Sequence, residues 1–259
     1  MVVLQPGTTF AGKWQVPAFL LSPDFRIRYT NPTPDEGPRG SHTGIQMLLN
    51  NRLSFAESSR PLRQIEKITA QQKGYNLEQT LVAVDPTVFI VHPSLSNLPG
   101  LTRSQIKDIY TGKVTNWKEL GGPDRAITPY AHPSARTGWF SDYILQAEKH
   151  HPRVVFVSGT PAALDRVAAD PGGIFDASAA QVLPRCDVRP LPVSDGGKFV
   201  APYEGELTFG KGCRRQANEK AFRNLVYPFY RELYVVYKDY PGNNNPDMVT
   251  CFSLMKDNH

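Results

Sequence analysis

The sequence predicts an α/β protein with mostly parallel, mixed sheets, and three of its features carry this prediction. Short apolar runs of strand length alternate along the chain with amphipathic segments of helix length, a pattern typical of α/β folds. The 259 residues include 20 Gly and 23 Pro, which indicates many short elements joined by turns and excludes a plain helical bundle. The 13 Phe, 11 Tyr and 3 Trp supply a core and exclude a disordered chain.

The first elements are a strand and a capped helix. Residues 25–29 (FRIRY) alternate apolar and basic side chains, as a half-buried strand does. The stretch 30–40 is rich in Pro, Gly, Asp and Asn, so we expect no regular structure there. Ser41 is a good N-cap, and Ile45 and Leu48 lie at helical spacing, which predicts a helix that begins here.

The next segments predict a strand, a helix and two buried strands. Residues 53–56 are typical of a short buried strand, and 62–74 of an amphipathic helix with a glycine stop. In 81–93, two apolar runs are separated by Asp85 and Pro86. Such continuous apolar runs indicate strands that are covered on both faces.

The middle of the chain continues the alternation of helices and strands. Thr102 predicts the N-cap of a helix that Gly112 ends. Residues 126–137 predict a short strand followed by a polar turn, and 138–150 predict a helix with Phe140 directed inward.

The last third contains the remaining strands. Residues 154–159 predict a strand, and 160–170 a helix with Pro at its first position. The stretch 172–183 predicts a strand, a turn and a short helix, and 233–237 a strong strand.

Composition excludes several classes of protein. The net charge is +5, but the basic residues are scattered and form no stripe with aromatic residues, which argues against nucleic-acid binding. A mildly basic protein suits a small anionic ligand. No apolar run reaches the roughly 20 residues of a spanning helix. The sequence also contains no motif for a metal or a nucleotide cofactor.

The three cysteines leave two interpretations open. Cys186 and Cys213 flank a stretch rich in Pro and Gly, and no CxxC or zinc spacing occurs. The pair forms either a disulfide or two free thiols in a reducing cell. The N-terminal segment lacks the features of a signal peptide, so either the protein is cytosolic or a leader is absent from this sequence.

Three polar turns precede or open predicted helices. They are GTTF at 7–10, GSHTG at 40–44 and SARTG at 134–138, and Ser59 and Arg60 add a hydroxyl and a guanidinium at a strand end. A helix N-terminus presents unpaired N–H groups and a partial positive charge. Brought together, such turns form an anion site, whereas taken singly each is an ordinary helix cap.

In these turns and in the stretch 98–122, which contains GLT and IKDIYTGKVTNW, the chain resembles the phosphate-binding proteins of ABC transporters. These are type II periplasmic binding proteins, and the likeness is greatest to cyanobacterial forms. The resemblance extends from Gly7 to about Lys238. It implies two α/β lobes with a ligand cleft between them.

The resemblance also implies where the lobes and the disulfide lie. Lobe one would comprise residues 1–88 and 233–259 and lobe two residues 89–232, with hinge strands near 88–91 and 233–237. Similar proteins carry a cysteine pair at the positions of Cys186 and Cys213, which implies a disulfide and an oxidising compartment. Cys251 would then stay free.

The family's ligand set is carried over to this sequence position by position. The ligand-binding residues implied are Thr9, Phe10, Ser41, His42, Thr43, Ser59, Arg60, Tyr130, Ser134, Ala135, Arg136 and Thr137. Ser59 stands where the family has an acid that accepts a hydrogen bond from protonated phosphate, and Tyr130 stands where it has an arginine. Arg136 or Arg60 would restore the positive charge, and Glu57 is a second candidate for the acceptor.

The function implied is capture of an oxyanion, with phosphate the leading ligand, by a monomeric periplasmic or extracellular solute-binding protein without cofactor or metal. Its partners would be ABC transporter membrane subunits or a signalling protein. Two alternatives are the sensing domain of a membrane-anchored receptor or kinase, and a homologue altered to bind another ligand. An enzyme is not expected, because adjacent Ser41 and His42 cannot face each other as nucleophile and base.

Overall fold

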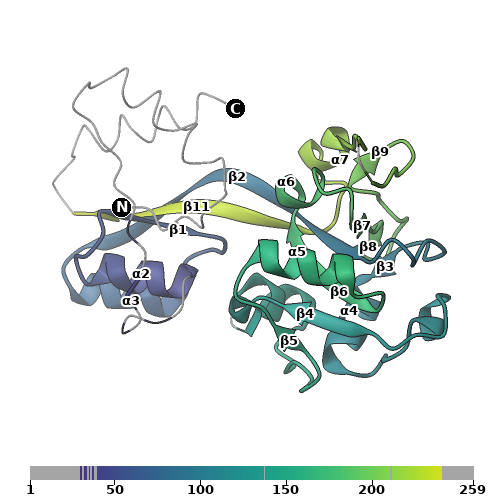
Figure 1. Ribbon diagram of the computed structural model, residues 1–259. Coiled ribbons are helices and arrows are strands. Elements are labelled where there is room, and N and C mark those ends of the chain that lie inside the picture. Colours follow the sequence, from purple (N-terminus) through teal and green to yellow (C-terminus); the bar gives the residue numbers. More distant parts are fainter. Residues whose placement is uncertain are drawn as a thin grey trace. The chain divides into compact units, whose positions relative to one another are not determined.

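The computed structural model of the chain describes residues 30, 32, 33, 35, 37, 40–136, 138–210 and 212–240. The chain forms two compact units. Unit 1 comprises Met1–Val84 and Glu232–His259, and unit 2 comprises Asp85–Arg231. The resemblance places the boundaries four residues later at the first crossing and one residue later at the second. The strands β2 (Asn76–Val91) and β11 (Tyr230–Asp239) each contain one boundary (Figure 1).

In unit 1, two helices pack beside a strand. The elements are α2 (Ser41–Leu49), β1 (Phe55–Ser58) and α3 (Gln64–Gln72). β1 pairs antiparallel with β11, with Phe55 opposite Tyr237. The apolar side of α2 lies against β1 and α3 because its hydrophobic residues recur at helical spacing (Figure 1). The central core residues are Ile45, Leu48, Leu49, Ala56 and Val236.

The sheet of unit 2 is mixed. Its strand β6 (Gly173–Ser178) pairs antiparallel with β2 and parallel with β4 (Thr128–Ala131), which in turn pairs parallel with β5 (Val155–Phe156). The short strand β7 (Arg189–Pro190) pairs antiparallel with β2. Together with the helices, these pairings confirm the α/β fold class with mixed sheets. The expectation that the sheets are mostly parallel is wrong for this sheet, because two of its four pairings above are antiparallel.

Helices α4 (Arg103–Thr111) and α5 (Thr160–Ala169) pack into separate cores of unit 2. Val88 and Ile90 belong to the core that contains α5, whereas Phe89 and Val91 belong to the core that contains α4. Because neighbouring strand residues point to opposite faces, this division means that the two helices cover opposite faces of the sheet.

The remaining elements of unit 2 are short. β3 (Leu101–Thr102) pairs parallel with β8 (Val193–Ser194), and β9 (Tyr203–Glu204) pairs antiparallel with β10 (Gln216–Ala217). The short helices are α6 (Ala179–Val182), α7 (Glu219–Arg223), the 3₁₀ helices η2 (Trp117–Leu120) and η3 (Pro133–Arg136), and the π-helix η4 (Phe140–Ile144).

The capping signals of α4 are confirmed. The Thr102 hydroxyl accepts a hydrogen bond from the backbone N–H of Gln105 at 3.2 Å. Gly112 ends the helix in the left-handed conformation at φ 80°, which a residue without Cβ adopts at little cost.

Three sequence predictions were wrong in detail. The two apolar runs of 81–93 belong to one continuous strand, β2, and Pro86 is tolerated because pairing with β6 begins at Thr87. The helix expected over 138–150 is reduced to the π-helix η4, after which Gln146 and Ala147 adopt positive φ angles. β1 begins at Phe55, two residues after the expected start.

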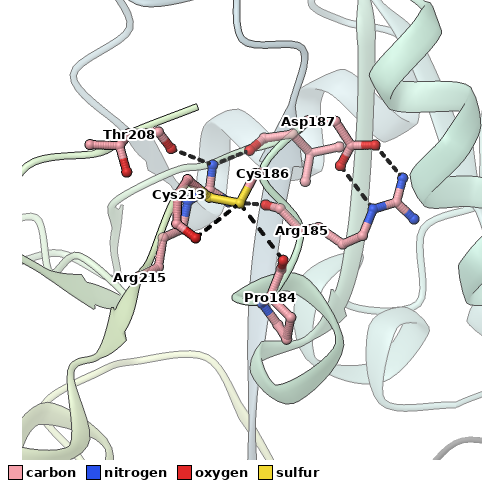
Figure 2. The surroundings of a disulfide bond; sticks show 8 residues. Pro184, Arg185, Cys186, Asp187, Thr208, Cys213 and Arg215 are labelled. Carbon is pink, nitrogen blue, oxygen red and sulfur yellow. Dashed lines mark hydrogen bonds and ion pairs between the residues drawn. A yellow bond between two sulfur atoms is a disulfide. The ribbon is translucent and has the colours of Figure 1, made fainter. Parts of the chain in front are cut away.

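Cys186 and Cys213 form a disulfide with a Cα–Cα distance of 5.9 Å, which selects one of the two interpretations left open by the sequence. Figure 2 shows Arg215 beside this bridge, where its guanidinium donates to the carbonyl oxygens of Arg185 and Val188. The disulfide and the hydrogen bonds of Arg215 thus both join the segment around Cys186 to the segment around Cys213.

In the described part of the chain, no helix is both long and apolar enough to cross a membrane. The same residues contain no group of three or more His, Cys, Asp or Glu side chains that could hold a metal ion.

Candidate functional site

Ser41 and Ser59, which lie 18 positions apart, meet at the start of α2. The backbone N–H of Ser59 donates to Ser41 Oγ at 3.0 Å, and the two hydroxyl oxygens are 3.3 Å apart. The contact follows from packing, because Ala56 of β1 lies against Gly44 of α2 and carries the next turn of the chain to the helix start. Two predicted site residues are therefore neighbours within unit 1.

The start of α2 supplies donors beside this pair. Gly40 precedes the helix and has no side chain to cap it, so the first backbone N–H groups of α2 do not receive a cap from this residue. His42 is exposed and Thr43 is buried. The helix end adds a partial positive charge to the two hydroxyls, an arrangement that attracts small anions.

Arg60 has a structural role in unit 1. Its side chain is buried, its NH1 and NH2 groups donate to the Glu66 carboxylate at 3.0 and 2.6 Å, and NH1 also donates to the Pro61 carbonyl. Burial alone would raise the pKa of Glu66, but hydrogen bonds from Arg60 and Arg63 hold it below its ordinary value. The guanidinium of Arg60, which the resemblance assigns to the anion site, thus forms an ion pair with Glu66 of α3.

Glu57 lies on the opposite side of β1 from α2. Ala56 faces α2, and successive strand residues alternate, so the Glu57 side chain lies on the face of β1 away from α2. Burial raises the pKa of Glu57 to about 8, so this carboxyl group is largely neutral at pH 7. The alternation argues against Glu57 as the acceptor that replaces the missing acid.

Tyr130 belongs to the core of unit 2 that contains α5. Only 7% of the residue is exposed, and its hydroxyl donates to Asp170 Oδ2 at 2.9 Å. Burial and this carboxylate raise the pKa of Tyr130 to about 12. Tyr130, like Arg60, thus has structural contacts within its own unit.

The turn after β4 carries three of the predicted residues on η3. Ser134 Oγ lies 2.7 Å from His132 Nδ1, and the backbone N–H of Ser134 donates to the same nitrogen. Ala135 is buried in the core that contains α4. His132 was not predicted, although its position directly before Pro133 and Ser134 was visible in the sequence.

Arg136 reaches a cavity of its own in unit 2. Its guanidinium carbon lies 3.9 Å from the ring centroid of Phe156. Both residues line a cavity of about 410 Å³ together with His150. Burial, aided by the Arg136 charge, lowers the pKa of His150. Arg136 and Lys149 both line this cavity and supply positive charge to it.

Thr9, Phe10 and Thr137 lie outside the described residues. The remaining ligand residues stay predictions: Ser41, His42, Thr43, Ser59, Arg60, Tyr130, Ser134, Ala135 and Arg136. Of these, the structure brings Ser41 and Ser59 together and gives Arg60 and Tyr130 buried partners of their own.

The structure also reveals a polar cluster that sequence reasoning missed. Arg231 donates to Asp85 Oδ2 at 2.5 Å, and the Ser178 hydroxyl donates to Asp85 Oδ1 at 2.5 Å. The sequence offered one signal for this cluster, namely that the charged residue Asp85 interrupts the apolar stretch 81–93. Its partners lie 93 and 146 positions away, so no local pattern could identify them.

A family model described as the PBP superfamily domain matches residues 10–253. The chain belongs to the PBP superfamily. This membership agrees with the α/β fold of two units and with the resemblance found in the sequence.

A curated relative and two solved structures extend the comparison. The phosphate-binding protein PstS of Staphylococcus epidermidis is 32% identical over 93 residues, which cover 35% of this chain and 29% of that protein. The match thus spans less than a third of the length of this curated relative. An ABC-type phosphate transport receptor from Vibrio cholerae has a TM-score of 0.67 at 18% identity, with 98% of this chain and 92% of that chain covered. PstS from Borrelia burgdorferi has a TM-score of 0.59 at 18% identity, with 98% and 90% covered.

Proposed function

We propose that the protein is an extracytoplasmic solute-binding protein that captures an oxyanion, with inorganic phosphate as the leading ligand, for ABC-type uptake. The observation that carries this proposal is the meeting of Ser41 and Ser59 at the start of α2. Membership of the PBP superfamily and the names of the relatives support it.

The donors at the start of α2 suit a tetrahedral oxyanion. Each hydroxyl can turn its proton toward an anion oxygen, and the first N–H groups of the helix point in the same direction. The contact between the two hydroxyls is long at 3.3 Å, so a bound anion exchanges a weak neutral hydrogen bond for charge-assisted ones.

The remaining parts of the proposal follow from the same evidence. The disulfide supports an oxidising, extracytoplasmic location. Binding without catalysis is supported because, among the described residues, the Ser41 hydroxyl meets the hydroxyl and the backbone N–H of Ser59, and no imidazole accepts a hydrogen bond from it as a general base would. The partners proposed are the membrane subunits of an ABC transporter, to which the protein would deliver its ligand as a monomer.

Calorimetric titration of the purified chain with phosphate, arsenate and sulfate tests the proposal. Phosphate is expected to bind with measurable heat, and Ser59→Ala is expected to weaken it by roughly tenfold or more, because hydrogen bonds to charged groups contribute about 1.5–3 kcal/mol. Ser96→Ala, at an exposed hydroxyl in unit 2, is the matched control. Absence of heat with all three oxyanions would contradict the proposed function.

A further inference from the structure

The polar cluster around Asp85 lies on one face and one end of the unit 2 sheet. Along β6, Phe175 and Ala177 belong to the core that contains α5, so alternation puts Asp176 and Ser178 on the other face. Thr87 is opposite Ser178 in the register of β2 and β6. This end of the sheet is also where β4 runs into the turn that holds His132.

Several groups in this cluster have more hydrogen-bonding capacity than the described residues use. Thr87 Oγ1, Asp176 Oδ1 and Arg231 Nε are buried and have no hydrogen-bond partner among them. A buried polar group without a partner is costly, and three in one place point to a site that accepts a polar molecule. An ion pair formed only to hold strands together would not need this surplus.

Arg231 is the positively charged residue of this cluster, and it forms an ion pair with Asp85. Its side chain is 30% exposed and the Asp85 side chain 19% exposed, so both reach solvent. Burial lowers the pKa of His132, and the Arg231 charge acts in the same direction. Tyr130, which stands where the family has an arginine, lies in the core of unit 2, and Arg136 lies over Phe156.

We propose that Arg231 and Asp85 form an oxyanion-recognition pair in unit 2, in which Arg231 donates to the anion and Asp85 accepts a hydrogen bond from a protonated one. This inference rests on the proposed function and names the ligand class, a singly protonated oxyanion such as monohydrogen phosphate. Ser178 and Arg231 occupy one acceptor site on each Asp85 oxygen, and a carboxylate has about four such sites, so acceptor capacity remains.

In this proposal, the Arg231–Asp85 pair lets the protein bind phosphate in preference to sulfate, although Ser59 stands where the family has an acid. A fully ionised anion such as sulfate has no proton to donate and meets the negative charge of Asp85 directly. Asp176 adds to this discrimination from the same face of the sheet. Its pKa is raised to about 6 by burial although the Arg231 charge acts to lower it, so it is largely ionised above neutral pH. Discrimination therefore comes from β2 and β6 and not from the end of β1.

Titration of phosphate and sulfate into matched variants tests the inference. Asp85→Asn is expected to reduce the ratio of phosphate to sulfate affinity by about tenfold or more, because one hydrogen bond to a charged group is lost. Arg231→Gln is expected to weaken phosphate by about tenfold or more on the same ground. Arg185→Gln, which removes an ion pair with Asp165 elsewhere in unit 2, is expected to leave both affinities unchanged.

Arg231→Lys keeps the charge and removes the planar fork, so it serves if Arg231→Gln does not fold, and we expect it to weaken phosphate binding too. If the parent protein binds phosphate but Asp85→Asn keeps the parent's selectivity and the Arg231 variants keep its affinity within twofold, the inference is overturned while the proposed function stands. If the parent binds no oxyanion, both are overturned.

Discussion

Ser59 donates its backbone N–H to the Oγ of Ser41 at 3.0 Å, and this hydrogen bond fastens the residue that follows β1 to the first residue of α2. The bond joins two turns that the sequence separates by a complete helix and strand. The Ser41 hydroxyl therefore holds the turn after β1 in place at the start of α2.

Ser41→Ala is therefore expected to lower the free energy of unfolding by about 1 kcal/mol, because the Ser59 N–H loses its acceptor. Urea denaturation followed by circular dichroism measures this change. Ser96→Ala, at an exposed hydroxyl, serves as the control and should unfold at the parent's midpoint. Equal midpoints for Ser41→Ala and the parent would show that this contact does not stabilise unit 1.

Arg60→Gln is expected to destabilise the protein by about 3 kcal/mol, since it leaves the buried Glu66 carboxylate without its charged partner. Phosphate affinity should stay within twofold of the parent at a temperature where both are folded. The double variant Arg60→Met with Glu66→Met should recover much of the loss, because it removes both charges. A large loss of affinity in a fully folded Arg60→Gln would assign Arg60 to the ligand instead.

Local chemistry determined which parts of the fold the sequence could predict. The cap at Thr102 and the glycine stop at Gly112 depend on neighbours within one helical turn, and both were predicted correctly. The continuity of β2 through Pro86 depends on where β6 begins to pair, which is tertiary information. The helix expected over 138–150 could not be judged from its local pattern either. Its apolar residues keep helical spacing, but the backbone adopts positive φ angles at Gln146 and Ala147.

The candidate site shows the same division. Ser41 and Ser59 were identifiable because each lies in a polar turn at the end of an element. The buried ion pair of Arg60 was not predicted, because sequence alone does not show that Glu66 lies within reach of its guanidinium. Arg231 lies 146 positions from Asp85, and only the folded sheet brings the two together.

Removal of the disulfide is expected to lower the free energy of unfolding by about 3.5 kcal/mol in the chain-entropy model, given the separation of 27 positions between Cys186 and Cys213. The double variant Cys186→Ser with Cys213→Ser should therefore melt well below the parent in a thermal scan. Ser96→Ala, at an exposed hydroxyl, is the control and should melt with the parent. A parent protein whose melting temperature is unchanged by a thiol reductant would contradict the stabilising role of the bridge.

Glu57 makes stability depend on pH in a direction that can be worked out. Its pKa is raised from 4.5 to about 8 by burial, so the unfolded chain loses this proton at lower pH than the folded chain. The contribution of Glu57 to stability is complete below about pH 4.5 and is lost as the pH rises toward 8. Glu57→Gln cannot ionise, so its stability relative to the parent should increase from pH 5 to pH 8, by an amount on the order of a few kcal/mol. Glu204→Gln, at an exposed residue, should follow the parent across this range. Parallel stability curves for Glu57→Gln and the parent would show that Glu57 ionises equally well in the folded protein.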